Sequence, residues 1–333
     1  MTIRVGLLGM GMMGKCHHDT YKKIKGVRVE AVCDADAQKR RGHIGHGFGE
    51  IDVSGYRVYS RAEQLLADPD LDVIDISLPT FLHARYTIAA LQAGKHVICE
   101  KPMARNVAEA KSMVAASRKT GKKLFLAHCI RFWPSYVKAR EIVQSGRYGS
   151  VRTARFCRLS GLPGWSWKNW LQQSSKSGLC ALDLHIHDAD FVMYLFGKPK
   201  SVLSVAGGLR PGSLDHIITA YNYGGGRLIS AEGAWEYAPG YPFSMIFSIA
   251  MERATLDMTR DLKLMLYPVN GAPKEVKAPA GDGYLHELRH FVECIRAGQD
   301  SPIIPPESAL NSIQLVEAEI KSAKSGKPVT VRF

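Results

Sequence analysis

The sequence lacks the signatures of several protein classes. Its seven cysteines include no CxxC pair, and no stretch reaches the ~18 continuous apolar residues that a membrane-spanning helix requires. An odd number of scattered cysteines argues against a disulfide framework and against a cysteine zinc site. No charged leader precedes the first apolar segment. We therefore expect a cytoplasmic protein with reduced thiols, no export signal and no membrane partner.

The sequence also lacks internal repeats, low-complexity tracts and a concentrated basic patch. The net charge is +13, but residues 1–122 contribute +6 and residues 123–333 contribute +7. Nucleic-acid binding uses clustered positive charge, so this diffuse excess predicts no nucleic-acid partner. At roughly 150 residues per domain, the chain length predicts about two domains.

The first part of the chain alternates between strand-like apolar runs and segments of helical periodicity. Two of the helical segments are expected to end at Gly94 and Gly121. The strand-like runs cover residues 3–8, 27–33, 72–78, 95–99 and 124–127. The alternation predicts βαβ units and a parallel sheet covered on both faces. We assign it to a domain of residues 1–122.

After residue 150 the pattern changes to β-rich segments that end in turn sequences. These segments cover residues 199–206, 215–223, 227–237 and 244–250. They predict a second α/β domain, residues 123–333, with an open, mostly antiparallel sheet. Helices are expected over residues 283–297 and 306–324. The apolar face that a partner subunit would cover is assigned to Ile217, Tyr221 and Tyr223.

A glycine motif follows the first strand and opens a helical segment. It reads Gly9-Met10-Gly11-Met12-Met13-Gly14, a match to GxGxxG. In this context the glycines permit a tight turn and let the backbone approach a pyrophosphate at the helix N-terminus. Asp34 stands 20 residues after Gly14, where a carboxylate can accept hydrogen bonds from an adenine ribose. Motif and carboxylate together predict a dinucleotide site that includes Met12 and Met13.

The cofactor preference depends on the surroundings of Asp34. A carboxylate there would repel the 2′-phosphate of NADP, which favours NAD. However, Lys39, Arg40 and Arg41 follow closely, and NADP sites use a nearby arginine. These three residues fit the solvated start of the next helix better. We therefore expect NAD and leave NADP open.

Further motifs run along most of the chain. They are Pro79-Thr80 with His83, Glu100-Lys101-Pro102, Arg131-Phe132, Ser177-Gly178, Asp183 with His187-Asp188, and Ser322 with Gly326. Together with the glycine motif they resemble the glucose–fructose oxidoreductase / inositol dehydrogenase (Gfo/Idh/MocA) family. The resemblance implies a Rossmann domain followed by an α/β domain, an active site between them, and a homodimer or homotetramer. It also implies cofactor contacts from Leu78, Thr80, His83 and Glu100.

The resemblance further assigns catalysis to Lys101, Asp183 and His187. Asp183 and His187 are four apart in a segment of helical character (Cys180 to Phe196), so both are expected on one face. His187 would accept the proton of a substrate hydroxyl during hydride transfer to nicotinamide. Lys101 would hold that hydroxyl, and Asp183 would orient the substrate or the charged imidazole. Whether Lys101 or His187 is the principal base stays open.

Several residues are candidates for substrate recognition. Trp167 belongs to a cluster with Trp165 and Trp170, and an aromatic face suits the apolar face of a sugar or cyclitol ring. Weaker candidates, for which core or surface roles are equally open, are Arg131, His128 and Tyr284. Many relatives carry three successive glycines where this chain has Gly178-Leu179-Cys180. The two larger side chains are expected to narrow the pocket or to change its preference, so no relative's substrate can be transferred.

A metal site is an alternative reading of His185-x-His187 with Asp188 and Asp190. On a strand, positions i and i+2 share a face, but on a helix they diverge by about 200°. The helical reading predicts no metal and a packed or solvent-facing His185.

The sequence therefore favours an NAD(P)-dependent dehydrogenase that oxidises a secondary hydroxyl of a sugar, sugar acid or cyclitol such as inositol. Besides the cofactor and further copies of the chain, the only expected partner is a small polyhydroxylated substrate. One alternative is a glycosidase that keeps NAD bound and oxidises its substrate transiently. A second alternative is a non-catalytic regulatory protein that senses NAD(P).

Overall fold

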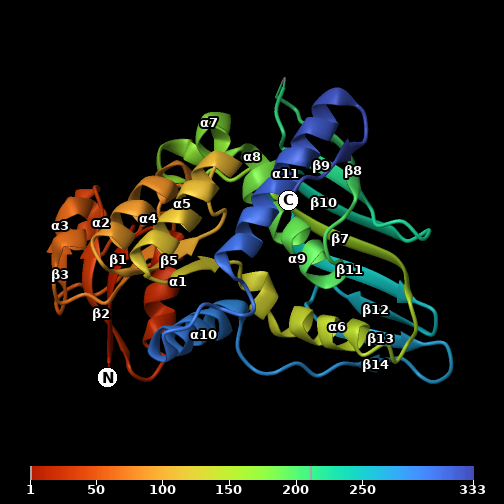
Figure 1. Ribbon diagram of the computed structural model, residues 1–333, viewed down its shortest axis with the longest axis horizontal. Helices are drawn as coiled ribbons and strands as arrows, with labels where there is room; N and C mark the ends of the chain where they lie inside the picture. The colour runs from red at the N-terminus through yellow and green to blue at the C-terminus, as the bar shows by residue number, and fades with distance from the viewer. Residues whose placement is uncertain (1, 211) are drawn as a thin grey trace. The chain divides into compact units, whose positions relative to one another are not determined.

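The computed structural model describes residues 2–210 and 212–333, which form two compact units (Figure 1). Among the described residues, unit 1 contains 2–129 and 282–310, and unit 2 contains 130–210, 212–281 and 311–333. The sequence suggested a single boundary between residues 122 and 123. The chain instead returns to unit 1 near its C-terminal end, and no local sequence signal marks this return.

Unit 1 is built on a parallel sheet of six strands. These are β1 (Ile3–Leu8), β2 (Val27–Cys33), β3 (Arg57–Tyr59), β4 (Val73–Ile76), β5 (His96–Glu100) and β6 (Leu124–Ala127). Their order is β3-β2-β1-β4-β5-β6, and every neighbouring pair is parallel. This is the doubly wound order of dinucleotide-binding domains. The predicted Rossmann fold is confirmed.

Helices cover both faces of this sheet. Two pairs pack together: α1 (Met12–Tyr21) with α10 (Gly283–Ala297), and α4 (His83–Gln92) with α5 (Val107–Thr120) (Figure 1). The shorter elements are α2 (Ala37–Arg40), α3 (Ala62–Ala67) and the 3₁₀ turn η1 (Thr80–Leu82). The chain turns through a left-handed residue at Gly94 and at Gly121, where the sequence predicted that these helices end.

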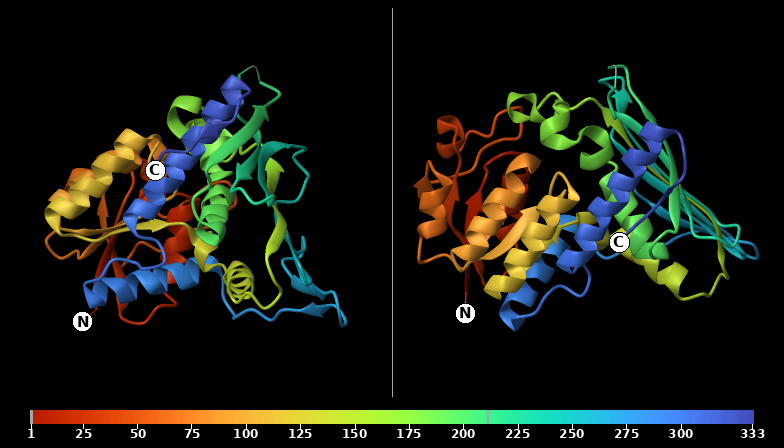
Figure 2. Two further views of the ribbon diagram at one scale, coloured as in Figure 1. Left: turned by 45° about the vertical axis from the view of Figure 1, so that its right-hand side comes forward. Right: turned by 45° about the horizontal axis from the view of Figure 1, so that its top comes forward.

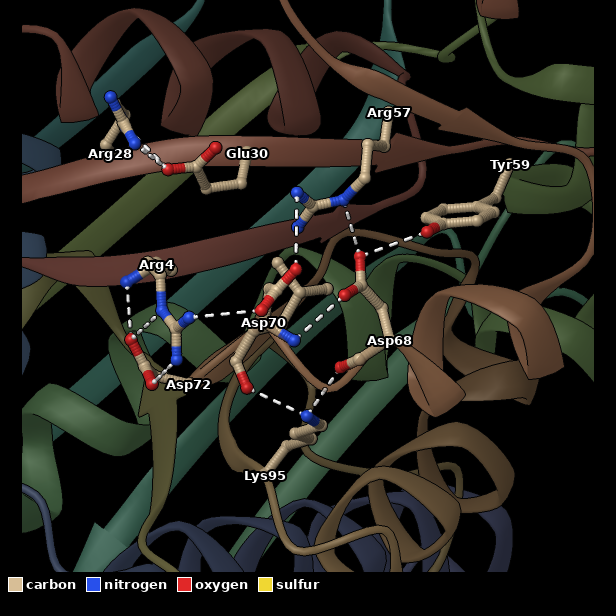
Figure 3. A network of polar contacts seen from close by, with 10 residues as sticks. Arg4, Arg28, Glu30, Arg57, Tyr59, Asp68, Asp70, Asp72 and Lys95 are labelled. Carbon is tan, nitrogen blue, oxygen red and sulfur yellow. Dashed lines mark hydrogen bonds and ion pairs between the residues drawn. The ribbon is translucent and has the colours of Figure 1, made fainter.

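A network of charged side chains joins the starts of β1, β4 and β5 (Figure 3). Nζ of Lys95 donates to the carbonyl oxygens of Asp68 and Leu71 at 2.6 and 2.8 Å. The Arg4 guanidinium pairs with Asp72, and this hydrogen bond lowers the pKa of the carboxyl. Ligands of parallel sheets bind at the carboxyl ends of the strands. The network therefore stabilises the edge opposite to the candidate site.

Unit 2 is built on a mostly antiparallel sheet of nine strands. The order is β14-β13-β12-β11-β7-β10-β9-β8-β15, in which only β7 and β10 pair in parallel among the described neighbours. The strands are β7 (Val151–Gly161), β8 (Ser201–Gly207), β9 (His216–Asn222), β10 (Leu228–Tyr237), β11 (Ser244–Met251), β12 (Ala254–Met258), β13 (Leu264–Pro268), β14 (Lys274–Glu275) and β15 (Val329–Thr330). The predicted second sheet is confirmed.

The helices of unit 2 gather on one face of this sheet (Figure 2). They are α6 (Pro134–Gln144), α7 (Ser174–Ser177), α8 (Leu179–Asp183), α9 (Ile186–Phe196) and most of α11 (Pro306–Ser325), with the 3₁₀ turns η2 (Cys129–Phe132) and η3 (Trp167–Gln172) nearby in sequence. Within the described ranges, no helix is both long and apolar enough to cross a membrane.

The prediction that Ile217 and Tyr221 form the exposed face of the sheet is wrong. Both side chains are buried, at 0% and 2% exposure, and Tyr223 is only partly exposed. Strand side chains alternate between the two faces, and Val205 and Ile218, which pair across β8 and β9, lie on the other face at 72% and 47% exposure. The sheet therefore has an exposed apolar face, but this face is formed by Val205 and Ile218 and not by the predicted residues.

Candidate active site

The glycine loop between β1 and α1 leaves space in front of it. A side chain at Gly9 or Gly14 would collide with backbone, because its Cβ would lie 2.6 Å from the Ser77 oxygen or 2.0 Å from the Gly9 oxygen. A Cβ at Gly11 would meet nothing within 4 Å. No side chain caps α1 at Gly11. The first N–H groups of the helix, which include those of the partly exposed Met12 and Met13, are thus placed to bind a phosphate.

Asp34 lies directly after β2 and is tied to the glycine loop. Its Oδ2 accepts a hydrogen bond of 2.9 Å from the N–H of Met10, and its Oδ1 accepts one of 2.9 Å from the N–H of Asp36. Nη1 of Arg40 donates to the carbonyl oxygens of Asp34 and Ala35. The guanidinium thus binds the chain itself, while the carboxylate keeps lone pairs for a ribose diol. The residues present fit NAD.

His83 connects the loops that follow β4 and β5. Its Nδ1 lies 2.8 Å from the carbonyl oxygen of Pro102, and its Nε2 lies 2.7 Å from that of Leu78. Burial lowers the pKa of His83, although the hydrogen bonds to the two carbonyl groups act to raise it. His83 and Thr80 are each 1% exposed, whereas Leu78 is partly exposed. The geometry makes His83 a support for the cofactor edge of the sheet.

Glu100 and Lys101 lie at the carboxyl end of β5. Glu100 is 5% exposed, and its Oε2 accepts a hydrogen bond of 3.0 Å from the N–H of Lys101. Lys101 is partly exposed. Of the weaker candidates in this unit, His128 is buried and Tyr284 is partly exposed. The charge of Cys129, together with burial and Glu100, holds the pKa of Tyr284 well above its usual value, so it stays a phenol.

Three buried titratable residues near Glu100 were missed by sequence reasoning. His17 from α1, Asp75 from β4 and Glu287 from α10 are each 0% exposed. Asp75 could have been recognised from the sequence, because it is the one charged residue in the otherwise apolar strand β4, and such a strand is expected to be buried. The other two residues carry no local signal, since each is one polar position in an amphipathic helix.

Asp183 and His187 are the partly exposed residues of an otherwise buried segment. From Leu179 to Met193, all residues except these two are buried. The segment lies in two helices, because Leu184 and His185, which keep helical backbone angles, separate α8, which ends at Asp183, from α9. Solvent nevertheless reaches both side chains. Two partly exposed polar side chains in an otherwise buried segment are suited to bind a ligand.

Two buried ion pairs hold α9. Arg158 donates to Asp188 at 2.8 and 3.1 Å, and Arg131 donates to Asp190 at 2.8 and 2.7 Å. All four side chains are at most 3% exposed. Arg131 was a substrate-binding candidate, and its guanidinium is committed to Asp190. The arrangement favours a supporting role for Arg131.

His185 is packed between α11 and the sheet. Its Nε2 lies 3.1 Å from Oε2 of Glu319, and both side chains are fully buried. A Cβ at Gly233 of β10 would lie only 2.8 Å from the His185 Cβ, so this glycine makes room for the ring. Across residues 2–210 and 212–333, no group of three His, Cys, Asp or Glu side chains could hold a metal ion.

The tryptophan loop and the Gly-Leu-Cys segment differ in exposure. Trp165 and Trp167 are 39% and 38% exposed, and the Lys168 ammonium lies 4.7 Å from the centre of the Trp167 ring. In contrast, Leu179 and Cys180 are 4% and 0% exposed. They pack in an apolar cluster with Leu171, Leu184 and Trp235. The expectation that these two side chains narrow a pocket is wrong, because they point into the core.

The strand order, the glycine loop and Asp34 define a dinucleotide-binding oxidoreductase domain. A family model described as "Oxidoreductase family, NAD-binding Rossmann fold" matches residues 3–128, and the GFO/IDH/MocA C-terminal domain model matches residues 136–257. The chain is 32% identical over 281 residues to trans-1,2-dihydrobenzene-1,2-diol dehydrogenase of Mus musculus, covering 79% of this chain and 80% of the relative. The protein belongs to the Gfo/Idh/MocA oxidoreductase family and is an NAD-binding enzyme.

Two more distant similarities span nearly the whole chain. Myo-inositol 2-dehydrogenase of Thermotoga maritima is 24% identical over 339 residues, covering 98% of each chain. The structure of levoglucosan dehydrogenase in complex with NADH and levoglucosan superposes with a TM-score of 0.87 at 24% identity, covering 100% of both chains. The structural similarity extends the shared fold to both units.

Proposed function

We propose that this enzyme oxidises a secondary hydroxyl of a sugar, sugar acid or cyclitol. The observation that carries the proposal is that Asp183 and His187 are the two partly exposed residues of segment 179–193, which is otherwise buried. The exposed rings of Trp165 and Trp167 support a substrate with an apolar ring face. Relatives named for inositol, levoglucosan and a dihydrobenzenediol support the same class.

The proposed roles divide proton transfer from substrate positioning. His187 accepts the hydroxyl proton, because an imidazole can take up and release protons near neutral pH. Lys101 holds the hydroxyl and stabilises the negative charge that develops on its oxygen. Asp183 orients the substrate or the charged imidazole. Bound NAD supplies the hydride acceptor for this chemistry.

The cofactor contacts follow from the residues that surround the glycine loop. The N–H groups at the start of α1 bind the pyrophosphate, and Asp34 accepts hydrogen bonds from the adenine ribose. The backbone near Leu78 and Thr80 lies at the same edge of the sheet and borders the nicotinamide half. Arg40 is held by the carbonyl oxygens of Asp34 and Ala35 and is not offered to a 2′-phosphate. These contacts support NAD over NADP.

The test is a turnover assay with NAD and NADP over a panel of inositols, aldoses and sugar acids. Absorbance of the reduced cofactor is followed, and cofactor binding is measured separately. Net NADH production with at least one polyol supports the proposal. Tight NAD binding without turnover across the panel would support the regulatory alternative. Release of an aglycone from glycosides without net NADH would support the glycosidase.

Two variants separate the proposed base from the hydroxyl-binding group. If His187 is the base, His187→Ala abolishes turnover at all accessible pH values and leaves NADH affinity within about twofold. Lys101→Arg keeps the charge and retains part of the activity. If Lys101 is the base instead, Lys101→Arg abolishes turnover and His187→Ala does not.

We also propose a homo-oligomer formed through the open face of the large sheet. Leu203, Val205 and Ile218 are adjacent exposed apolar side chains on this face, which supports the proposal that a second copy of the chain covers it. Val205→Glu with Ile218→Glu should lower the mass measured by light scattering to that of the monomer. Val58→Glu, at a 41% exposed position of unit 1, is the matched control.

A reducing compartment stays our proposal, supported by seven free cysteines.

A further inference from the structure

A buried chain of polar contacts leads from β4 to the amide of Lys101. Nδ1 of His17 lies 2.9 Å from Oδ2 of Asp75, and Nε2 of the same ring lies 3.1 Å from Oε1 of Glu100. The second oxygen of Glu100 accepts the hydrogen bond from the N–H of Lys101. His17 and Asp75 are fully buried, and the Glu100 side chain is 7% exposed. Asp75, His17, Glu100 and the Lys101 amide thus form a continuous series of close contacts.

The Asp75 carboxyl group gathers several hydrogen-bond partners. Besides His17, it accepts hydrogen bonds from the Tyr21 hydroxyl at 2.6 Å and from the Ser77 hydroxyl at 3.2 Å. Burial alone would lower the pKa of His17, but Asp75 and Glu100 raise it well above its usual value. The two acidic side chains therefore hold the His17 ring as an imidazolium.

Glu287 from α10 completes the cluster as a neutral acid. It is fully buried, and among the described residues neither of its carboxyl oxygens has a hydrogen-bond partner. Burial and the negative charges of Glu100 and Asp75 raise the pKa of Glu287 well above its usual range, against the effect of His17.

The other titratable groups beside His17 are uncharged at neutral pH. Burial raises the pKa of Cys16 to about 11. Burial and the charge of Asp75 raise the pKa of Tyr21 well above its usual value. Tyr284 is held as a phenol, as described above. His17 is thus the only cation among these neighbours within the described part of the chain.

We propose that His17 and Asp75 are positioning residues for Lys101. They hold the Glu100 carboxylate in the one orientation in which its second oxygen fixes the Lys101 amide. This inference rests on the proposed role of Lys101 in catalysis. Stability alone explains the cluster poorly, because buried ion pairs seldom stabilise a fold more than apolar packing does. Perturbed buried groups next to a site residue instead point to a functional arrangement.

An NMR experiment tests the positioning without any substrate. The full-length protein is labelled with ¹⁵N-lysine, and the Lys101 amide signal is assigned by its loss in Lys101→Arg. His17→Gln, Asp75→Asn and Glu100→Gln should each shift this signal, because each changes the hydrogen bond that the amide donates. His18→Gln is the matched control. His18 is a buried neighbour in α1 whose ring contacts Asp19 and Tyr56 instead.

A kinetic experiment with a substrate from the panel tests the consequence. His17→Gln should lower kcat by about 10- to 100-fold, as expected for a misplaced site residue, while the KM for substrate and the NADH affinity change little. The double variant His17→Gln/Glu100→Gln should be no worse than Glu100→Gln, since His17 acts through Glu100.

Each outcome decides the inference. A Lys101 amide signal that is unchanged in folded His17→Gln and Asp75→Asn overturns it, whether or not a substrate is found. Multiplicative losses in the double variant also overturn it. If the shifts occur but no panel compound is oxidised, the positioning stands and the proposed function fails.

Discussion

The N–H of Met10 in the glycine loop donates a hydrogen bond of 2.9 Å to Oδ2 of Asp34, which lies 24 residues further along the chain. One carboxylate therefore shapes the phosphate-binding loop and faces the expected ribose. Its loss should affect both halves of the cofactor site.

The first prediction concerns cofactor choice. Asp34→Ser should weaken NAD binding by about 1–3 kcal/mol, the cost of leaving polar groups unpaired, and should weaken NADP binding less because the repulsive charge is removed. Fluorescence titration with NADH and NADPH measures both affinities. Asp36→Ser is the control, since Asp36 caps α2 through the N–H of Gln38 and serine can keep this cap. Equal losses for both cofactors would count against the ribose contact.

Much of this half of the molecule can be predicted from the sequence. The strands at residues 27–33 and 124–127 have the predicted bounds, because parallel strands are apolar throughout. The GxGxxG turn is equally local, since sterics demand glycine at Gly9 and Gly14.

Long-range contacts limit the rest of the prediction. His17 and Asp75 are 58 residues apart, and neither has a neighbour in sequence that reveals the pairing. The division between α8 and α9 has no local sequence signal, because Leu184 and His185 keep helical backbone angles. The choice of exposed sheet face failed because β8 and β9 carry apolar side chains on both faces.

The second prediction concerns His83. His83→Phe removes the contacts with Leu78 and Pro102, so the free energy of unfolding should fall by about 1–3 kcal/mol and the Kd for NADH should rise. His96→Phe is the matched control. His96 accepts a hydrogen bond from the N–H of Lys123 at the other edge of the sheet, so its loss should reduce stability without changing NADH affinity. An unchanged Kd in His83→Phe would contradict the supporting role.

The third prediction concerns the pair Arg131–Asp190. Arg131→Met leaves a buried carboxylate without its cation and should cost about 3–5 kcal/mol of stability in denaturant unfolding. Adding Asp190→Leu should recover most of this loss. A stable Arg131→Met variant with a raised KM for substrate would instead return Arg131 to the substrate-binding candidates.

The fourth prediction concerns the pH dependence of stability through Glu287. Its folded-state pKa is raised, so the folded protein binds one more proton than the unfolded chain above the unfolded pKa. Stability is therefore lost as pH rises from about 4.5, by up to about 1.4 kcal/mol per pH unit until the folded pKa is reached. Glu287→Gln should remove this slope, as measured by urea unfolding from pH 5 to 8. Parallel curves for the two proteins would show that Glu287 is ionised in the fold.

Hydride transfer from a substrate carbon to NAD is the central claim, and isotope transfer tests it most directly. A panel compound that reduces NAD is prepared with deuterium at the carbinol carbon, and the NADH formed is isolated and analysed by mass spectrometry. We predict NADH that carries one deuterium, in amounts equal to the oxidised product. Substrate conversion with unlabelled NADH, or without net NADH, would contradict the account.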